Sequence, residues 1–340
     1  MTAAPTELEV RGLTKHFRVG NGLFGRSLVH AVDDVDFTLR PGHVTALVGE
    51  SGSGKSTVAR LLLRLYSPTA GSVVFDGRDV ASERSRADML RYRSQVQMIF
   101  QDPFGSLNPV KTVRHHLARP LQIHGLVAHG KLEERVYELL ETVGLVPPDR
   151  IAAKYPHELS GGQRQRVAIA RALAVEPTVI IADEPTSMLD VSIRIGILNL
   201  ILELKERHGL AFLYVTHDLA SARYVADEVL VMYAGQIVER GPVEDVLQSP
   251  LHPYTRLLLS AVPNPVTGSE KVVIRPTKGL SAAVDPAAGC RFVDRCPLAI
   301  AVCSQVTPEL VDDSRGRSAR CHVTAPSTAI REEGYVGSTG

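Results

Sequence analysis

Residues 49–56 have the residue types and the spacing to bind phosphate. They read Gly-Glu-Ser-Gly-Ser-Gly-Lys-Ser, which matches the pattern G-x-x-x-x-G-K-[ST]. Glycines let the backbone turn successive N–H groups toward phosphate oxygens, and a helix that follows adds the positive end of its dipole. We expect Lys55 to reach the β- and γ-phosphates of a nucleoside triphosphate and the Ser56 hydroxyl to bind Mg²⁺. The predicted nucleotide-binding residues of this loop are Gly49, Glu50, Ser51, Gly52, Ser53, Gly54, Lys55, Ser56 and Thr57.

The residues on either side of this loop predict the context that the motif needs. Residues 44–48 form an apolar run of the length of a buried strand, and residues 57–66 have a helical pattern. The alternative is a Gly- and Ser-rich surface turn ahead of an ordinary helix. The order strand, loop, helix favours the phosphate-binding interpretation.

Two acidic residues, Asp183 and Glu184, follow a second apolar run at 179–182. A carboxylate at the end of a core strand beside a phosphate loop can hold Mg²⁺, directly or through water. We expect this role for Asp183, and we expect Glu184 to polarise the water that attacks the γ-phosphate. The alternative is that the two acids only solvate a strand end, which the phosphate loop in the same chain argues against.

Residues 159–163, Leu-Ser-Gly-Gly-Gln, form a second turn that can accept an anion. The serine and the paired glycines precede a predicted helix at 164–175, so the chain has two helix starts suited to phosphate. One γ-phosphate could use both if two subunits met head to tail. In isolation, a Gly-Gly linker with an N-cap serine would explain the same residues.

Strand and helix patterns alternate on both sides of a mostly helical stretch. Helical periods at 113–123 and 132–143 predict a helical insertion, and strands at 97–100, 179–182 and 211–215 flank it. Such near-continuous apolar runs are typical of parallel strands that helices cover on both faces. Further short strands are predicted at 8–10, 37–39, 44–48 and 73–75, a helix at 192–208, and a strand pair at 229–233 and 236–239 turned by Ala234 and Gly235. The pattern predicts a doubly wound parallel α/β core.

The bulk properties narrow the class of protein. A chain of 340 residues is too long for one compact core, so a large domain with an appendage is expected. A formal net charge of +1 argues against a dedicated nucleic-acid binder. No run of residues has the length and apolarity of a membrane span, and the N-terminus lacks a signal pattern. We therefore expect a cytoplasmic protein.

Taken together, these motifs resemble the nucleotide-binding subunit of an ATP-binding cassette (ABC) transporter, over nearly the entire chain. Residues 49–56 look like its Walker A motif, residues 179–184 like its Walker B motif, and residues 159–163 like its signature motif. The resemblance implies an α/β P-loop NTPase fold, with a RecA-like parallel core, an antiparallel β subdomain, a helical insertion and a small C-terminal extension. It also implies that ATP is the nucleotide, that Mg²⁺ accompanies it, and that the protein is an ATPase.

The resemblance assigns roles to further residues. Gln101 is similar to the Q-loop glutamine, which touches Mg²⁺ and senses the membrane partner, and Phe17 to the aromatic residue that stacks on adenine. His217 resembles the switch histidine at the γ-phosphate, and Asp190 belongs to a stretch like the D-loop, in which Met188 replaces a frequent alanine. In such a transporter the signature residues reach the ATP of a partner subunit; here they are Ser160, Gly161, Gly162 and Gln163. The implied catalytic residues are Glu184 and His217, and Mg²⁺ is held through Ser56, Gln101 and Asp183.

Two longer segments resemble the ATPases of oligopeptide and dipeptide importers. They are residues 98–109, which surround the Q-loop glutamine, and residues 252–263, which follow the core. An insertion at 22–26 is similar to one in that group's second, F-type subunits. These features imply two membrane-spanning permease subunits as partners, a related ATPase subunit as the second cassette, and an indirect link to an extracytoplasmic substrate-binding protein. They also imply a peripheral place on the cytoplasmic side of the cell membrane.

All the cysteines lie in the C-terminal part of the chain, as Cys290, Cys296, Cys303 and Cys321. In a cytoplasmic protein, metal or cluster ligation competes with inert thiols, because disulfides are disfavoured there. The spacing C-x5-C-x6-C-x17-C differs from the close C-x2-C of a zinc ribbon. Four thiolates suit an iron–sulfur cluster, and the tail resembles one that holds [4Fe–4S] in these importers. Zinc and unmetallated thiols remain the alternatives.

These inferences define the expected organisation and function. We expect a nucleotide-binding domain over 6–250 with a helical insertion at about 102–165, a cysteine-containing extension at 251–330, and a flexible tail at 331–340. The leading hypothesis is an ATPase that drives import of dipeptides or oligopeptides; nickel and oligosaccharide importers have similar sequences. A soluble cassette ATPase acting on ribosomes or DNA is a second hypothesis, which the charge counts against. A lone phosphate-loop kinase leaves residues 159–163 unexplained.

Overall fold

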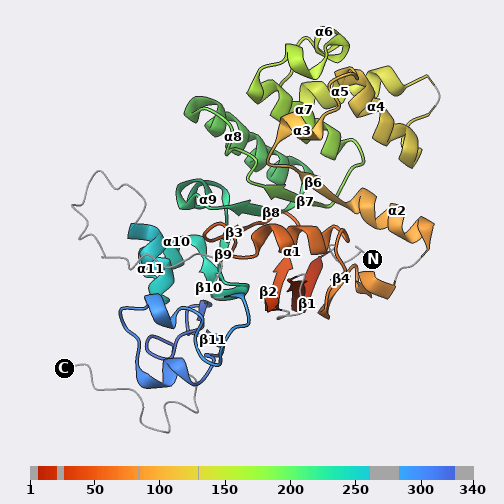
Figure 1. Cartoon of the computed structure of the whole chain (residues 1–340). Helices are drawn as coiled ribbons and strands as arrows, with labels where there is room; N and C mark the ends of the chain where they lie inside the picture. The colour runs from red at the N-terminus through yellow and green to blue at the C-terminus, as the bar shows by residue number, and fades with distance from the viewer. Residues whose placement is uncertain (1–6, 21–26, 83–84, 129, 261–282, 326–340) are drawn as a thin grey trace. The chain divides into compact units, whose positions relative to one another are not determined.

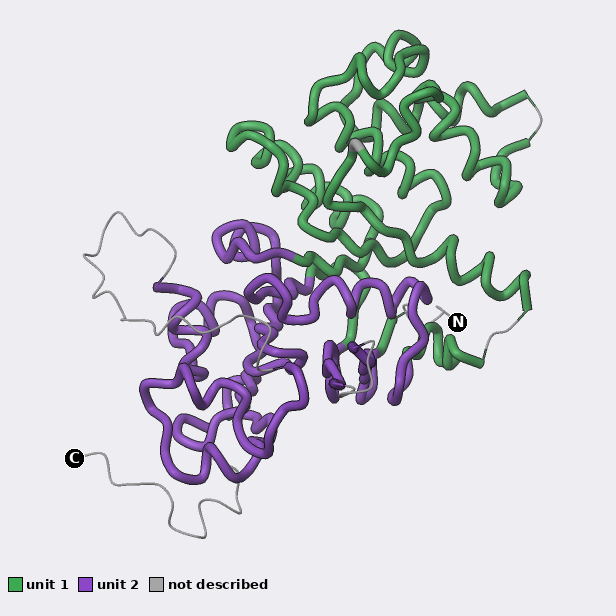
Figure 2. Tube along the Cα trace, viewed as in Figure 1, with its two compact units in different colours: residues 1–9, 38–44, 73–215 green, residues 10–37, 45–72, 216–340 purple. Residues whose placement is uncertain are grey.

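The computed structural model describes residues 7–20, 27–82, 85–128, 130–260 and 283–325. The insertion at 22–26, the segment at 261–263 and the tail at 331–340 therefore lie outside the described residues. The chain divides into two compact units, shown in Figure 2. The first unit comprises residues 1–9, 38–44 and 73–215, and the second comprises residues 10–37, 45–72 and 216–340.

A parallel sheet forms the core of the first unit. Strand β7 (Val179–Asp183) lies between β6 (Val96–Ile99) and β8 (Ala211–Thr216), and Ile99 pairs with Ala182 and Asp183 with Val215. Every residue of β7 and β8 is buried, as expected for strands that helices cover on both faces. Helices α7 (Gly161–Leu173) and α8 (Val191–His208) pack against one another, and α7 also contacts β6. The predicted strands and helix of this region are confirmed.

A group of helices separates β6 from β7 in the sequence. Its members are α3 (Pro103–Ser106), α4 (Val113–His124), α5 (Leu132–Thr142) and α6 (Pro148–Ala153), and Figure 1 shows them gathered beside α7. Helix α4 begins at the N-cap Thr112, whose hydroxyl accepts from His115 N, and ends at Gly125 with a φ of 62°. The helical periods at 113–123 and 132–143 are confirmed by α4 and α5. Before this group, α2 (Arg86–Gln95) leads into β6, and β4 (Ala70–Phe75) pairs with β5 (Arg78–Asp79).

The second unit combines a parallel pair with antiparallel strands. Strand β3 (Val44–Val48) pairs in parallel with β9 (Glu228–Tyr233), and β9 pairs antiparallel with β10 (Gln236–Pro242). Strand β12 (Ser318–Ala319) pairs with β10 and β11 (Val311–Asp312) pairs with β12, so residues 311–319 extend this sheet. Further helices described in the unit include α1 (Lys55–Leu62), α9 (Leu219–Val225), α10 (Val243–Gln248) and α11 (Pro253–Ser260), and most of β1 (Leu8–Val19) and β2 (Ser27–Leu39) also belongs to it.

The boundaries of four elements differ from the sequence-based expectation. Strands β1 and β2 are 12 and 13 residues long, much longer than the predicted strands at 8–10 and 37–39. The prediction was too short because the remaining residues of each strand are mostly half-buried or exposed and carry no clear apolar pattern. Helix α7 begins three residues before the predicted start, at the first residue after its cap Ser160. Helix α1 ends at Leu62 rather than at the predicted residue 66. Just beyond this end, Arg64 adopts a left-handed φ of 55°, which does not continue the helix.

Candidate nucleotide site

The predicted phosphate loop lies in the second unit, between β3 and α1. Its lysine is buried, with 6% of its surface exposed, and points back into the loop. The Lys55 ammonium donates to Gly49 O at 2.7 Å and to Glu50 O at 2.9 Å. A buried cation that lines the inside of a Gly-rich loop ahead of a helix is suited to bind an anion.

The last glycine of the loop is required by its conformation and its surroundings. Gly54 caps α1 with a φ of 114°, and a Cβ atom there would lie 2.2 Å from Ala31 O. Any other residue would be strained and would collide with the backbone of β2. The sequence motif therefore reflects a close backbone approach inside the second unit.

Two further predicted residues belong to the second unit. Phe17 on β1 is half-buried, and its ring meets that of Tyr66 edge-to-face with centroids 5.5 Å apart. The Lys15 ammonium lies 5.2 Å from the centroid of the Phe17 ring. His217 is exposed and follows β8 directly, before Asp218, which caps α9 by accepting from Ala220 N. Because Phe17 is only half-buried, part of its ring remains accessible to a ligand.

The predicted catalytic acid lies in the first unit with the predicted sensor. Glu184 follows β7 and has a φ of 45°, a conformation that costs free energy for a non-glycine residue and is concentrated at functional sites. Its backbone N donates to Val215 O at 2.8 Å, which holds the residue at the end of the sheet. The side-chain amide of Gln101 donates to the Glu184 carboxylate at 3.0 Å. The preceding Asp183 is buried, with 8% exposure. The structure therefore brings Gln101 and Glu184 together.

The turn at 159–163 is a helix cap with an exposed serine. Ser160 Oγ accepts from Gln163 N at 3.3 Å, and Ser160 N donates to Gln163 Oε1 at 3.1 Å, which together form a capping box. Gly162 is buried, and a Cβ atom there would lie 2.5 Å from Ile193 Cγ2 on α8. The second glycine thus allows α7 and α8 to approach closely, while Ser160 faces solvent.

Exposed apolar residues lie at and just before the start of helix α8, next to this cap. Met188, Val191 and Ile195 are 55%, 72% and 49% exposed. Asp190, the predicted D-loop acid, is the exposed N-cap residue of the helix, and its side chain makes no cap hydrogen bond. An apolar strip beside a polar helix start is typical of a surface that contacts a partner.

The cysteines gather in the second unit. Cys303 and Cys321 are buried, Cys290 and Cys296 are half-buried, and Cys290 N donates to Cys303 O at 2.7 Å. Burial raises the pKa of the Cys290 thiol to about 12, and the other three cysteines add to this shift. All four cysteines are described, and none forms a disulfide. The Cys290 thiol therefore interacts with those of the other three cysteines, and a bound cation would favour thiolates there.

Sequence reasoning missed the contacts that the C-terminal extension makes with the phosphate loop. Arg295 donates to both carboxylate oxygens of Glu50, at 2.9 and 2.8 Å, across 245 residues of sequence. Glu50 N donates to Tyr254 Oη at 2.8 Å. No local pattern signals such pairs, because the partners are distant in the sequence and each has an ordinary neighbourhood.

A histidine cluster on β1 and β2 was also missed. The rings of His16 and His30 stack with centroids 3.7 Å apart, and each ring nitrogen lies 3.3 Å from a carboxylate oxygen of Asp33. These three side chains are close enough to hold a metal ion. Arg291, which is buried, also pairs with Asp33, and its charge opposes a second cation there.

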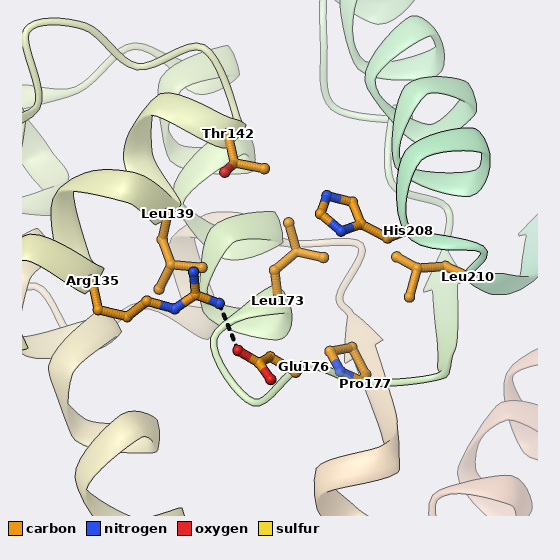
Figure 3. A pocket seen from close by; sticks show the side chains of 8 residues that line it. All are labelled: Arg135, Leu139, Thr142, Leu173, Glu176, Pro177, His208 and Leu210. Carbon is orange, nitrogen blue, oxygen red and sulfur yellow. Dashed lines mark hydrogen bonds and ion pairs between the residues drawn. The ribbon is translucent and has the colours of Figure 1, made fainter. Parts of the chain in front are cut away.

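A surface pocket of about 320 Å³ lies in the first unit, apart from the predicted residues (Figure 3). Its lining comes from α5, the end of α7 and the end of α8, and Arg135 forms an ion pair with Glu176 at its edge, at 2.8 Å. None of the predicted site residues lines this pocket. The candidate site is therefore defined by its motifs rather than by this cavity.

Comparison with known proteins gives two family matches. Residues 32–187 match the family described as ABC transporter, and residues 238–303 match the one described as oligopeptide/dipeptide transporter, C-terminal region. Within the ranges that the structure describes, none of the helices combines the length and the apolarity needed to cross a membrane.

Individual relatives match along most of the chain. The oligopeptide transport ATP-binding protein AppF of Bacillus subtilis is 44% identical, over 95% of this chain and 99% of its own. The di/tripeptide transport ATP-binding protein DppF of Pseudomonas aeruginosa is also 44% identical, over 90% of this chain and 94% of its own. The solved dimer of the ATP-binding cassette MJ0796, bound to ADP and Pi, is 30% identical with a TM-score of 0.61, over 69% of this chain and 98% of that one.

Proposed function

The chain belongs to the family of ABC transporter ATP-binding subunits, and on this premise we propose that it powers the import of dipeptides or oligopeptides across a membrane. The observation that carries the choice of cargo is the match of residues 238–303 to the C-terminal region of oligopeptide/dipeptide transporters. Relatives named for peptide transport cover at least nine-tenths of the chain, and this supports the same choice.

The ATP site combines the phosphate loop with the predicted aromatic residue. In this proposal the loop N–H groups and Lys55 bind the triphosphate, and Phe17 stacks on adenine. Buried Lys55 and half-buried Phe17 support these roles, since one offers a fixed cation and the other an accessible ring. The residues proposed to contact ATP are Phe17, Gly49, Glu50, Ser51, Gly52, Ser53, Gly54, Lys55, Ser56, Thr57, Gln101 and His217.

Glu184 is the proposed general base for hydrolysis. It would take a proton from the attacking water as the bond between the γ-phosphorus and the leaving oxygen of ADP breaks, and His217 would position the γ-phosphate. Ser56, Gln101 and Asp183 provide the oxygen donors that Mg²⁺ prefers. Bound Mg²⁺ neutralises charge on the phosphates. The strained backbone of Glu184 and its contact with Gln101 support a site held ready for chemistry.

The ATP site is proposed to need a second cassette. Ser160, Gly161, Gly162 and Gln163 of one subunit would close over the γ-phosphate bound by the other, near the D-loop Asp190. The exposed Ser160 and the exposed apolar residues Met188, Val191 and Ile195 support this role, because they offer surface that a second subunit could contact. A related ATPase subunit is the expected partner.

The membrane partners are proposed to dock beside the Q-loop glutamine. Phe100 and Val110, on either side of α3, are 41% and 72% exposed, which leaves apolar surface for a short helix of a permease subunit. Two such permease subunits would place the chain peripherally on the cytoplasmic side of the cell membrane, with a substrate-binding protein on the opposite side. Nucleic acid is not a proposed partner.

The cysteine cluster is proposed to hold [4Fe–4S] through Cys290, Cys296, Cys303 and Cys321. No three of these described cysteines have sulfurs within 4.8 Å of one another. The Cys290 thiol interacts electrostatically with those of the other three cysteines, which supports one shared site, and four thiolates are the ligand set of a [4Fe–4S] cluster. Such a cluster, when bound, supplies a cross-link between segments of the extension. Anaerobic purification followed by iron and sulfide analysis tests this, and zinc or neither would contradict it.

An uptake assay tests the proposed function. Cells that lack the gene should lose uptake of a labelled dipeptide or oligopeptide, and the gene should restore it while Lys55→Ala should not. Uptake of nickel or of an oligosaccharide, lost instead of peptide uptake, would contradict the proposed cargo. Co-purification of ribosomes or DNA in place of permease subunits would contradict the importer function itself.

A further inference from the structure

The phosphate loop carries a carboxylate that is held by the C-terminal extension. Glu50 is the second residue of the loop. Arg295, immediately before Cys296, donates a hydrogen bond to each of its carboxylate oxygens, at 2.8 and 2.9 Å. The Arg295 side chain is 11% exposed and that of Glu50 39% exposed. A bidentate pair that is half-shielded from water holds its geometry better than an exposed surface pair.

Two aromatic rings also contact the guanidinium of Arg295. The guanidinium lies 5.6 Å from the ring centroid of Tyr233 and 5.7 Å from that of Phe292. Phe292 is 2% exposed, and its ring also contacts the fully buried Tyr254, whose hydroxyl accepts from Glu50 N. The backbone and the carboxylate of Glu50 are therefore both attached to one aromatic cluster of the extension.

The charge of Glu50 conflicts with the function of its loop. A triphosphate is strongly anionic, and a bare carboxylate in the same loop would repel it. We propose that Arg295 is a positioning residue for ATP, which neutralises the Glu50 carboxylate and holds the loop backbone ready to accept phosphate. This inference rests on the proposed function of the loop as an ATP site, and it makes the C-terminal extension part of that site.

Equilibrium binding of a fluorescent ATP analogue with Mg²⁺ tests this proposal. Arg295→Gln should weaken binding about five- to tenfold, because it leaves the carboxylate bare and the loop untethered. Glu50→Gln should weaken binding less than Arg295→Gln does, because it removes the repelling charge. The double variant should return to within about twofold of the parent. The loss in Arg295→Gln should also shrink as salt is raised.

A second bidentate pair in the same unit provides a matched control. Arg223 donates to both oxygens of Glu244, at 2.9 and 2.7 Å, and both side chains are about half exposed. Arg223→Gln should leave nucleotide affinity unchanged. A merely structural role for Arg295 predicts instead that Arg295→Gln and Glu50→Gln weaken binding alike, and this result would overturn the proposal.

The same measurements distinguish a failure of the role proposed for Arg295 from a failure of the proposed ATP site. A parent protein that does not bind the ATP analogue would contradict the proposed nucleotide site. If Arg295→Gln binds the analogue as tightly as the parent does, the proposed nucleotide site stands and only the role of Arg295 is overturned. Thermal denaturation of each variant shows whether a change in affinity comes from unfolding, and Arg295→Lys, which keeps the charge, should recover part of the binding.

Discussion

At the scale of single residues, Glu184 shows how the fold prepares a side chain. Its backbone is held at a φ of 45° by the hydrogen bond to Val215 O, and its carboxylate accepts from Gln101. Glutamine keeps the size and the hydrogen-bonding oxygen of this side chain but cannot take a proton. Glu184→Gln should therefore bind ATP like the parent and lower kcat by about a hundredfold or more. Steady-state phosphate release measures kcat, and hydrolysis at the parental rate would remove Glu184 as the base.

A buried histidine predicts a pH dependence at the same scale. Burial lowers the pKa of His252 to about 3, and its Nδ1 accepts from Tyr254 N at 3.0 Å, so the folded protein keeps the ring neutral. The unfolded chain takes up this proton near pH 6.5, so the stabilisation is complete above that pH and is lost as the pH falls from 6.5 toward 3. The cost is about 2 kcal/mol at pH 5.

The matched variant for this effect is His252→Gln. Its amide can accept from Tyr254 N as the ring does, but it does not titrate. The fall in unfolding midpoint between pH 7.5 and pH 5 should be smaller in His252→Gln than in the parent, and calorimetry measures both. An equal fall in the two proteins would show that other groups control the acid sensitivity.

At the scale of elements, the contact between α7 and α8 depends on one glycine. A Cβ atom at Gly162 would lie 2.5 Å from Ile193 Cγ2, whereas at Gly161 it would lie 3.5 Å from Leu189 Cδ2, an ordinary contact. Alanine normally stabilises a helix relative to glycine, by roughly 0.5–1 kcal/mol. Gly161→Ala should therefore be neutral or stabilising, and Gly162→Ala should destabilise by about 1–3 kcal/mol.

Urea unfolding of both alanine variants measures this difference. The clash is specific to one side chain, so Gly162→Ala should cost little when it is made in an Ile193→Ala background. A loss of stability that persists in that background would place the strain elsewhere. Equal effects of the two glycine substitutions would show that helix propensity alone decides.

At the scale of the whole molecule, the motifs are divided between chains in the proposed mechanism. Lys55→Ala disables the loop that binds ATP, and Ser160→Ala disables the lid that closes over the partner's ATP, so each variant alone should be inactive. In the absence of the related subunit, copies of this chain that pair with one another form mixed dimers in which one site combines an intact loop with an intact lid. Mixing equal amounts of the two variants should thus restore about a quarter of the ATPase rate of the parental homodimer. Phosphate release from titrated mixtures measures this, and no recovery in mixtures that do form dimers would contradict a shared site.

Much of the fold could be predicted from local patterns. Strand β3, helices α4 and α5, and the antiparallel pair β9 and β10 lie where apolar periodicity and turn residues placed them, because burial of a strand or helix imposes its own period on the sequence. The ends of β1 and β2 could not be predicted in this way. Their outer residues are half-buried or exposed, so burial imposes no apolar pattern there.

The sequence by itself predicted the phosphate loop, the signature turn and the acidic strand end, because each is a short motif whose chemistry depends on neighbouring residues. Only the tertiary structure decided that Glu50 lies against Arg295 and Tyr254, that Gly162 lets α7 approach Ile193 closely, and that His252 is buried and neutral. These contacts join residues distant in the chain, and packing selects such partners through shape and charge rather than through spacing.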